Sequence, residues 1–130
     1  MSTLKKALPY IALMSGLLTN ILSINVQAAG NPRHGEDVFA AECAECHSVR
    51  EGKNKKGASL FAVVGRNAAT VPDASYSDAL RASNIVWTVE QLDSYISAPK
   101  KAVPNGKMKY DGLESAADRA DLLAYLATVH

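Results

Sequence analysis

The chain has 130 residues, of which 48% are hydrophobic and 21% are charged, and its formal net charge is +1. This length fits one domain, and the balanced charge argues against a nucleic-acid-binding protein, which normally carries a basic excess. Only two cysteines are present, Cys43 and Cys46. Because they lie three positions apart, we expect them to act together at one place.

The first 28 residues have the layout of a secretory signal peptide. Lys5 and Lys6 precede a stretch without charged residues from 7 to 26, and the small residues of VQAAG follow it. We expect cleavage after Ala28 and export to the periplasm. Residues 29–130 then hold 12 basic residues, the 14 of the whole chain less the two lysines, against 13 acidic ones. The alternative is an uncleaved membrane anchor, but the polar residues within this stretch make it poorly suited to span a bilayer.

Residues 31–47, NPRHGEDVFAAECAECH, are predicted to form the first helix after the signal peptide. Asn31 is a natural N-cap, and Pro32 suits the first helical position. Gly35 costs a helix about 1 kcal/mol relative to alanine, and a close contact with another helix would explain its presence.

The remaining chain is predicted to contain three helices joined by long loops, which gives a mostly α fold. Residues 50–75 lack a clear period, and an irregular region of this length is uncommon unless something such as a large buried cofactor organises it. Residues 100–112 are rich in turn formers and are expected to be loop. Helices are expected at 77–84, 88–99 and 115–129. Pro99 marks the end of the second helix, and the three helix starts carry the capping residues Ser77, Thr88 and Ser115.

The stretch CAECH, residues 43–47, carries the chemistry. On a helical turn its two thiols and its imidazole project to one side, so the thiols can add to the two vinyl groups of a haem while the imidazole faces the iron. A disulfide would close too small a loop to stabilise the fold, zinc lacks further ligands, and a thioredoxin-like centre lacks its βαβ pattern. The motif therefore favours covalent attachment of a c-type haem.

Met108 is the candidate for the sixth ligand of the iron. It lies in the polar loop PNGKMKY and is the only methionine beyond the predicted signal peptide. Ligation by histidine and methionine raises the reduction potential and saturates the iron, which favours electron transfer over the binding of oxygen or peroxide. His130 is the competing ligand, but it is the last residue, where chain ends fray.

The order of these motifs resembles class I c-type cytochromes, most closely the mitochondrial cytochrome c type and its short bacterial relatives. The resemblance covers nearly all of residues 34–129. It rests on Gly35 and Phe39 before CAECH, and then on KKGASLFAVVGR, YSDAL, IVWT, YISAPKKAVPNGKM and RADLLAYL. It implies that residues 29–130 form a mostly α, single-domain cytochrome c fold, with helices and long loops wrapped around one covalently bound haem c.

The resemblance also implies roles for single residues. Cys43 and Cys46 would form thioethers to the haem, and His47 and Met108 would be its axial ligands. A backbone carbonyl, here that of Ala58 where the family has proline, is expected to fix the His47 ring. Gly35 and Phe39 would pack against the last helix near Leu122 and Tyr125. Near the propionates, the haem pocket would be lined by Arg66, Tyr76 and Trp87. Tyr95 would line its methionine side.

Besides Ala58, four further positions depart from the family pattern. Gly106 replaces a threonine whose hydroxyl bonds near a propionate, which predicts a more mobile methionine loop. Leu80 replaces an asparagine, which predicts a drier haem interior. Tyr110 stands where phenylalanine is usual beside the methionine, and Glu42 stands where lysine is common before the first cysteine.

The implied function is that of a one-electron carrier and not an enzyme, moving electrons between periplasmic or membrane redox complexes of a respiratory chain. The protein would be a monomer that makes transient contacts with acidic redox partners. These partners would dock on a basic rim, whose positive charge Glu42 and Glu45 reduce. The alternative is that the rim is an ordinary solvated loop. That rim is formed by Lys100, Lys101, Lys107 and Lys109. A haem-based peroxidase or gas sensor with a labile methionine, motivated by Gly106, and a membrane-tethered carrier remain open alternatives.

Overall fold

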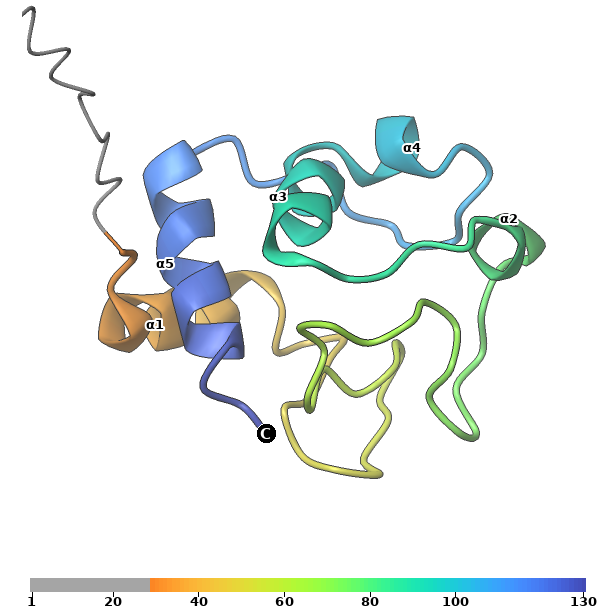
Figure 1. The fold of residues 1–130 in the computed structure, drawn as a ribbon, viewed down its shortest axis with the longest axis horizontal. Coiled ribbons are helices and arrows are strands. Elements are labelled where there is room, and N and C mark those ends of the chain that lie inside the picture. The colour runs from red at the N-terminus through yellow and green to blue at the C-terminus, as the bar shows by residue number, and fades with distance from the viewer. Residues whose placement is uncertain (1–28) are drawn as a thin grey trace, which may run out of the picture.

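The computed structural model describes residues 29–130, so the predicted signal peptide lies outside the described residues. This part of the chain is mostly α, as predicted, and its only β pairing is an isolated bridge between Asn67 and Val86. Long loops join the helices (Figure 1). None of the helices in 29–130 has the length and apolar character needed to cross a membrane. The helices are α1 (Pro32–Glu42), α2 (Asp78–Ala82), α3 (Val89–Ser97), α4 (Pro99–Ala102) and α5 (Ala116–Leu126).

The close contact expected at Gly35 is formed between α1 and α5, which cross one another (Figure 1). A Cβ atom on Gly35 would lie 1.9 Å from the carbonyl oxygen of Asp121 and 2.8 Å from the Cβ of Tyr125. Beside it, the rings of Phe39 and Tyr125 have their centroids 5.8 Å apart. Leu122 is 1% exposed and lies in the same core. The glycine therefore lets the two backbones touch.

The first turn of α1 is fixed to α5 by polar contacts as well. The Asn31 side chain accepts hydrogen bonds from the amides of Arg33 and His34, as its predicted capping role requires. The Asn31 amide donates to Asp121 Oδ1 at 2.6 Å, and His34 Nδ1 lies 2.8 Å from Asp121 Oδ2. The hydrogen bond to Asp121 raises the pKa of His34, and the Asn31 amide and His34 lower the pKa of the Asp121 carboxyl.

The first helix is shorter than predicted, because it ends at Glu42 and not at His47. The Ala44 amide reaches back five residues to the Phe39 carbonyl at 2.9 Å, and this breaks the regular helical ladder. The Cys46 and His47 amides then both donate to the carbonyl of Cys43, at 3.0 and 2.9 Å. The CAECH motif is therefore a tight turn at the end of α1.

The second correction concerns residues 99–102, which form α4 although loop was expected from 100. Pro99 does end α3, because a proline lacks the N–H that the helix needs, but it also begins α4 at the position where its fixed φ is suited. The predicted caps are confirmed at the start of α2, α3 and α5, where the side chains accept from backbone amides: Ser77, Thr88 and Ser115.

The irregular region of residues 50–75 is organised partly by side chains that bond to backbone. Ser59, 2% exposed, donates to the Arg50 carbonyl at 2.6 Å and accepts from the Phe61 amide at 3.1 Å. The Asn54 side chain accepts from the Ser59 amide at 2.9 Å. These contacts satisfy the polar groups of a loop that passes through the interior.

Candidate functional site

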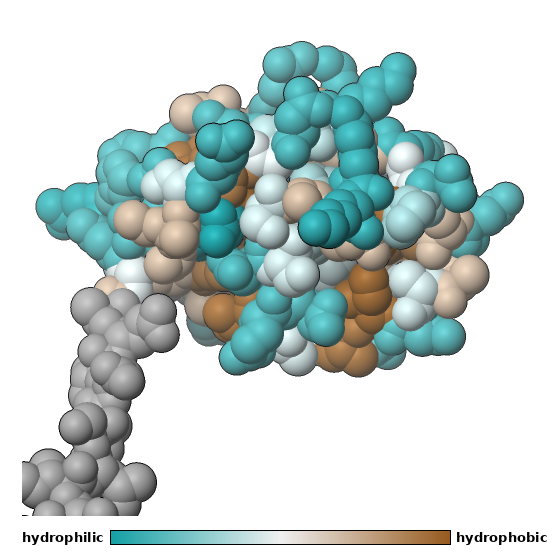
Figure 2. Space-filling view, turned by 90° about the horizontal axis from the view of Figure 1, so that it is seen from above, coloured by the Kyte–Doolittle hydropathy of each residue, from teal (hydrophilic) through white to brown (hydrophobic). Residues whose placement is uncertain are grey.

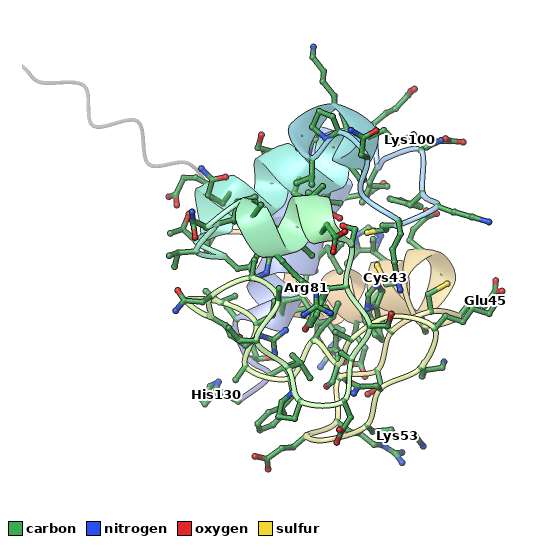
Figure 3. The ribbon with its side chains drawn as sticks, turned by 90° about the vertical axis from the view of Figure 1, so that its right-hand side faces the viewer. Cys43, Glu45, Lys53, Arg81, Lys100 and His130 are labelled. Carbon is green, nitrogen blue, oxygen red and sulfur yellow. The ribbon has the colours of Figure 1, made fainter. Side chains whose placement is uncertain are left out.

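The turn after α1 brings the side chains of the CAECH motif together. Both cysteines are free thiols and half-buried. Burial, with the nearby Glu42 carboxylate, raises the pKa of Cys43 to about 11. Figure 3 shows Cys43 near the centre of the molecule at the end of α1, whereas Glu45 lies at its edge. The turn therefore holds both free thiols, and burial favours the protonated form of Cys43.

His47 is oriented by the backbone carbonyl that was expected to hold it. Its Nδ1 donates to the Ala58 oxygen at 2.7 Å, so the hydrogen bond survives without the family's proline. Burial lowers the pKa of His47, which favours the neutral imidazole that binds metals. With Nδ1 engaged, Nε2 is the ring nitrogen that remains available to bind a metal.

Gly57 completes the support of this ring, and the sequence analysis did not single it out. A Cβ atom at this position would lie 2.3, 2.8 and 2.9 Å from the Cε1, Nδ1 and Nε2 atoms of His47. The Gly57 amide donates to the Cys46 carbonyl at 2.8 Å, which fixes the backbone against the ring. The signal in the sequence was the glycine directly before Ala58, whose carbonyl holds the same ring.

The predicted pocket residues fall into two groups. Arg66, Trp87 and Tyr95 are brought together: the Trp87 amide donates to the Arg66 carbonyl at 2.8 Å, and the Trp87 and Tyr95 rings have centroids 4.9 Å apart. Burial lowers the pKa of the Arg66 guanidinium. Tyr76 instead supports the loop before α2, where its hydroxyl accepts from the Val71 amide at 3.1 Å.

Met108 is half-buried in the loop between α4 and α5. Two residues further on, the Tyr110 hydroxyl donates to Glu42 Oε2 at 2.7 Å. Burial, with the Glu42 hydrogen bond, raises the pKa of Tyr110. The methionine loop is thereby joined to the residue directly before Cys43, although the two segments lie far apart in the sequence.

The donor set fits a haem better than a bare metal ion. Within residues 29–130, no group of three or more His, Cys, Asp or Glu side chains is placed to hold an ion. A c-type haem needs fewer protein ligands, because two free thiols and one oriented imidazole suffice for attachment and for one axial bond. Cys43, Cys46 and His47 meet that requirement.

The lysines of the predicted basic rim differ in their surroundings. Lys100 pairs with Asp111 at 2.6 Å, and Lys107 donates to the Ser75 hydroxyl at 2.5 Å. Lys101 and Lys109 are exposed and, within residues 29–130, take part in no salt bridge. The face on which α4 lies is covered mainly by hydrophilic side chains (Figure 2). On the other side, Glu45 pairs with Lys56 at 2.5 Å, so that part of its charge is locally balanced.

Comparison with known proteins agrees with these features. The sequence model of the family described as Cytochrome c matches residues 33–130. The chain is 38% identical to a cytochrome c of Euglena viridis over 100 residues, which cover 77% of this chain and 98% of that protein. It is 44% identical to a cytochrome c2 of Rhodopila globiformis over 100 residues, covering 77% and 94% of the two chains. It is 39% identical to a cytochrome c of Nigella damascena over 105 residues, covering 80% and 95%.

These matches support neither the peroxidase nor the gas-sensor alternative. They extend over nearly the whole of the described domain, and so include the CAECH turn, the Met108 loop and the α1–α5 contact. The chain therefore belongs to the cytochrome c family, and it is an electron carrier, not an enzyme, with a covalently bound haem c and its iron.

Proposed function

We propose that Cys43 and Cys46 hold the haem through thioethers and that His47 and Met108 are its axial ligands. The observation that carries this assignment is the 2.7 Å hydrogen bond from His47 Nδ1 to the Ala58 carbonyl. It orients the imidazole and leaves Nε2 as the ligating atom. When bound, the haem supplies an iron that alternates between the ferric and ferrous states.

The other pocket residues shape the surroundings of the haem. We assign Arg66, Tyr76 and Trp87 to the neighbourhood of the propionates and Tyr95 to the methionine side. Trp87 is 7% exposed and packs against Tyr95 with the two rings tilted at 53° to one another, which supports a dry wall at this place. A dry pocket with a nearby guanidinium tunes the reduction potential through burial and charge.

Replacing Met108 with alanine is expected to abolish the methionine–iron charge-transfer band of the ferric holoprotein at neutral pH. The thioether is the only methionine sulfur in residues 29–130, so no other can take its place. His130→Ala is the control, because it removes the competing ligand and should leave the band unchanged. A wild-type protein without the band, or a Met108→Ala variant that keeps it, would falsify the ligand assignment.

We further propose that residues 1–28 are a signal peptide and that residues 29–130 are the mature monohaem domain, working in the periplasm between complexes of a respiratory chain. The charge pattern of the N-terminal segment supports export. Mass spectrometry of the native protein tests it: a chain beginning at Ala29 supports cleavage, whereas an intact N-terminus favours the membrane-tethered alternative.

We also propose that the basic rim docks acidic redox partners. Lys109→Glu is expected to slow association with such a partner several-fold at low ionic strength, with the difference fading as salt is added. Lys53→Glu makes the same charge change at the opposite end of the molecule from Lys100 (Figure 3). Association rates measured by stopped-flow spectroscopy decide the matter, and equal slowing by both variants would count against a localised docking rim.

A further inference from the structure

The segment around Met108 lacks backbone support of its own. The Gly106 amide donates to the Val103 carbonyl at 3.1 Å, and the Leu113 amide donates to the Ile96 carbonyl at 3.0 Å. Between these two points, residues 107–112 take part in no backbone–backbone hydrogen bond within the described chain. Side chains must therefore hold this stretch in place.

Three side-chain contacts reach out from the stretch, and they are not equivalent. Lys107 bonds to the Ser75 hydroxyl, and Asp111 pairs with Lys100. The second contact joins side chains that are 94% and 67% exposed, so water and salt weaken it. The third joins Tyr110 to Glu42 at 2.7 Å, and its donor is a half-buried, rigid ring. A hydrogen bond to a carboxylate is stronger than one between neutral groups, and the Lys107 bond, although also charged, is made by an exposed and flexible side chain.

The anchor of this third contact is rigid. Glu42 is the last residue of α1, and α1 is packed on α5 through Gly35 and Phe39. The next residue is Cys43, the first cysteine of the CAECH turn. The hydrogen bond therefore links the Met108 segment directly to the helix end that carries the haem attachment.

We propose that Tyr110 and Glu42 form a latch, a pair of positioning residues that keeps the Met108 loop closed and so controls how often the sixth position of the iron opens. The inference rests on the proposed ligation by Met108. Glu42 and Tyr110 are two of the five departures from the family pattern, and the structure shows that they contact one another. Gly106 is expected to loosen the loop on one side of Met108, and the latch would hold it on the other.

An external ligand measures the opening. A small ligand such as imidazole binds the ferric iron only when Met108 has left, so its apparent affinity rises in proportion to the open fraction. Removing one hydrogen bond to a carboxylate should raise that fraction about tenfold. Tyr110→Phe is expected to lower the apparent dissociation constant for imidazole by about this factor.

The experiment titrates the ferric holoprotein with imidazole and follows the loss of the methionine–iron charge-transfer band. Four variants are compared with wild type: Tyr110→Phe, Glu42→Ala, the double variant, and Tyr125→Phe. The last removes a tyrosine hydroxyl that has no hydrogen-bond partner among the described residues and should leave the affinity unchanged. The two single variants should behave alike, and the double variant should add nothing, because each change removes the same bond.

A second measurement does not depend on the iron. Hydrogen exchange of the Leu113 amide, which ends the unsupported stretch, should become about tenfold faster in Tyr110→Phe and stay unchanged in Tyr125→Phe. A wild-type protein that shows the charge-transfer band, combined with unchanged imidazole affinity in Tyr110→Phe or additive effects in the double variant, overturns the latch alone. A wild-type protein without the band overturns the ligation by Met108 on which the latch rests.

Discussion

Replacing Gly57 with alanine is expected to displace the His47 imidazole and to lower the free energy of unfolding of the holoprotein by about 3 kcal/mol. The added Cβ would lie 2.3 Å from the Cε1 atom of the ring, which no real side-chain packing allows. The ring cannot move freely, because its Nδ1 is bonded to the Ala58 carbonyl and its other nitrogen is assigned to the iron. Either the hydrogen bond to Ala58 or the proposed bond to the iron must lengthen.

The distinctive result is spectroscopic. Gly57→Ala should alter the absorption spectrum of the haem and its reduction potential, because it acts on His47, the proposed axial ligand. Gly52→Ala is the matched control: nothing lies within 4 Å of a Cβ there, and its φ of +65° alone costs about 1 kcal/mol. Equal spectra in the two variants would show that Gly57 does not support the ring. Chemical denaturation of both holoproteins gives the stabilities.

Replacing Gly35 with alanine is expected to destabilise the protein by about 4 kcal/mol, although helix propensity alone predicts a gain of about 1 kcal/mol. The sign of the measured change in stability shows whether the steric clash or the helix propensity dominates. A Cβ on Gly35 would lie 1.9 Å from the backbone oxygen of Asp121, so α1 and α5 must separate. Separation exposes Phe39 and Leu122, which are buried in the core.

Thermal and denaturant unfolding of the ferric holoprotein measure this effect. Glu36→Ala, at the neighbouring exposed position of α1, should change the free energy of unfolding by no more than about 0.5 kcal/mol. The charge-transfer band of Gly35→Ala should persist under native conditions, because the contact lies away from the iron ligands. A stability equal to or above that of wild type would refute the close contact between the helices.

The features that the sequence predicted correctly are those decided by neighbouring residues. Asn31, Ser77, Thr88 and Ser115 cap their helices because a side-chain oxygen needs to reach only two or three residues along the chain. The contact of Gly35 with α5 is an exception, because its partners Asp121 and Tyr125 lie more than 80 positions away and were implied only by the family resemblance. Capping, which depends only on neighbouring residues, therefore predicted most of the helix starts correctly.

Three features of the fold were not predicted from the sequence. Helical spacing continues through Cys46, but the bond from Ala44 to Phe39 ends α1 earlier. Pro99 was predicted to end a helix, and it also begins α4. Glu42 and Tyr110 lie 68 positions apart, so no local pattern could pair them. The first two are set within a few residues along the chain, and only the third depends on tertiary packing.

The most direct test of the proposed ligation is a redox titration, followed optically, of the mature holoprotein and of Met108→Ala. The wild type should show a single one-electron transition, with the methionine–iron band present only in the ferric form. The variant should show a potential lower by on the order of 0.1 V, a fraction of the roughly 0.8 V range that axial ligands span. An unchanged potential in the variant would contradict Met108 as the sixth ligand.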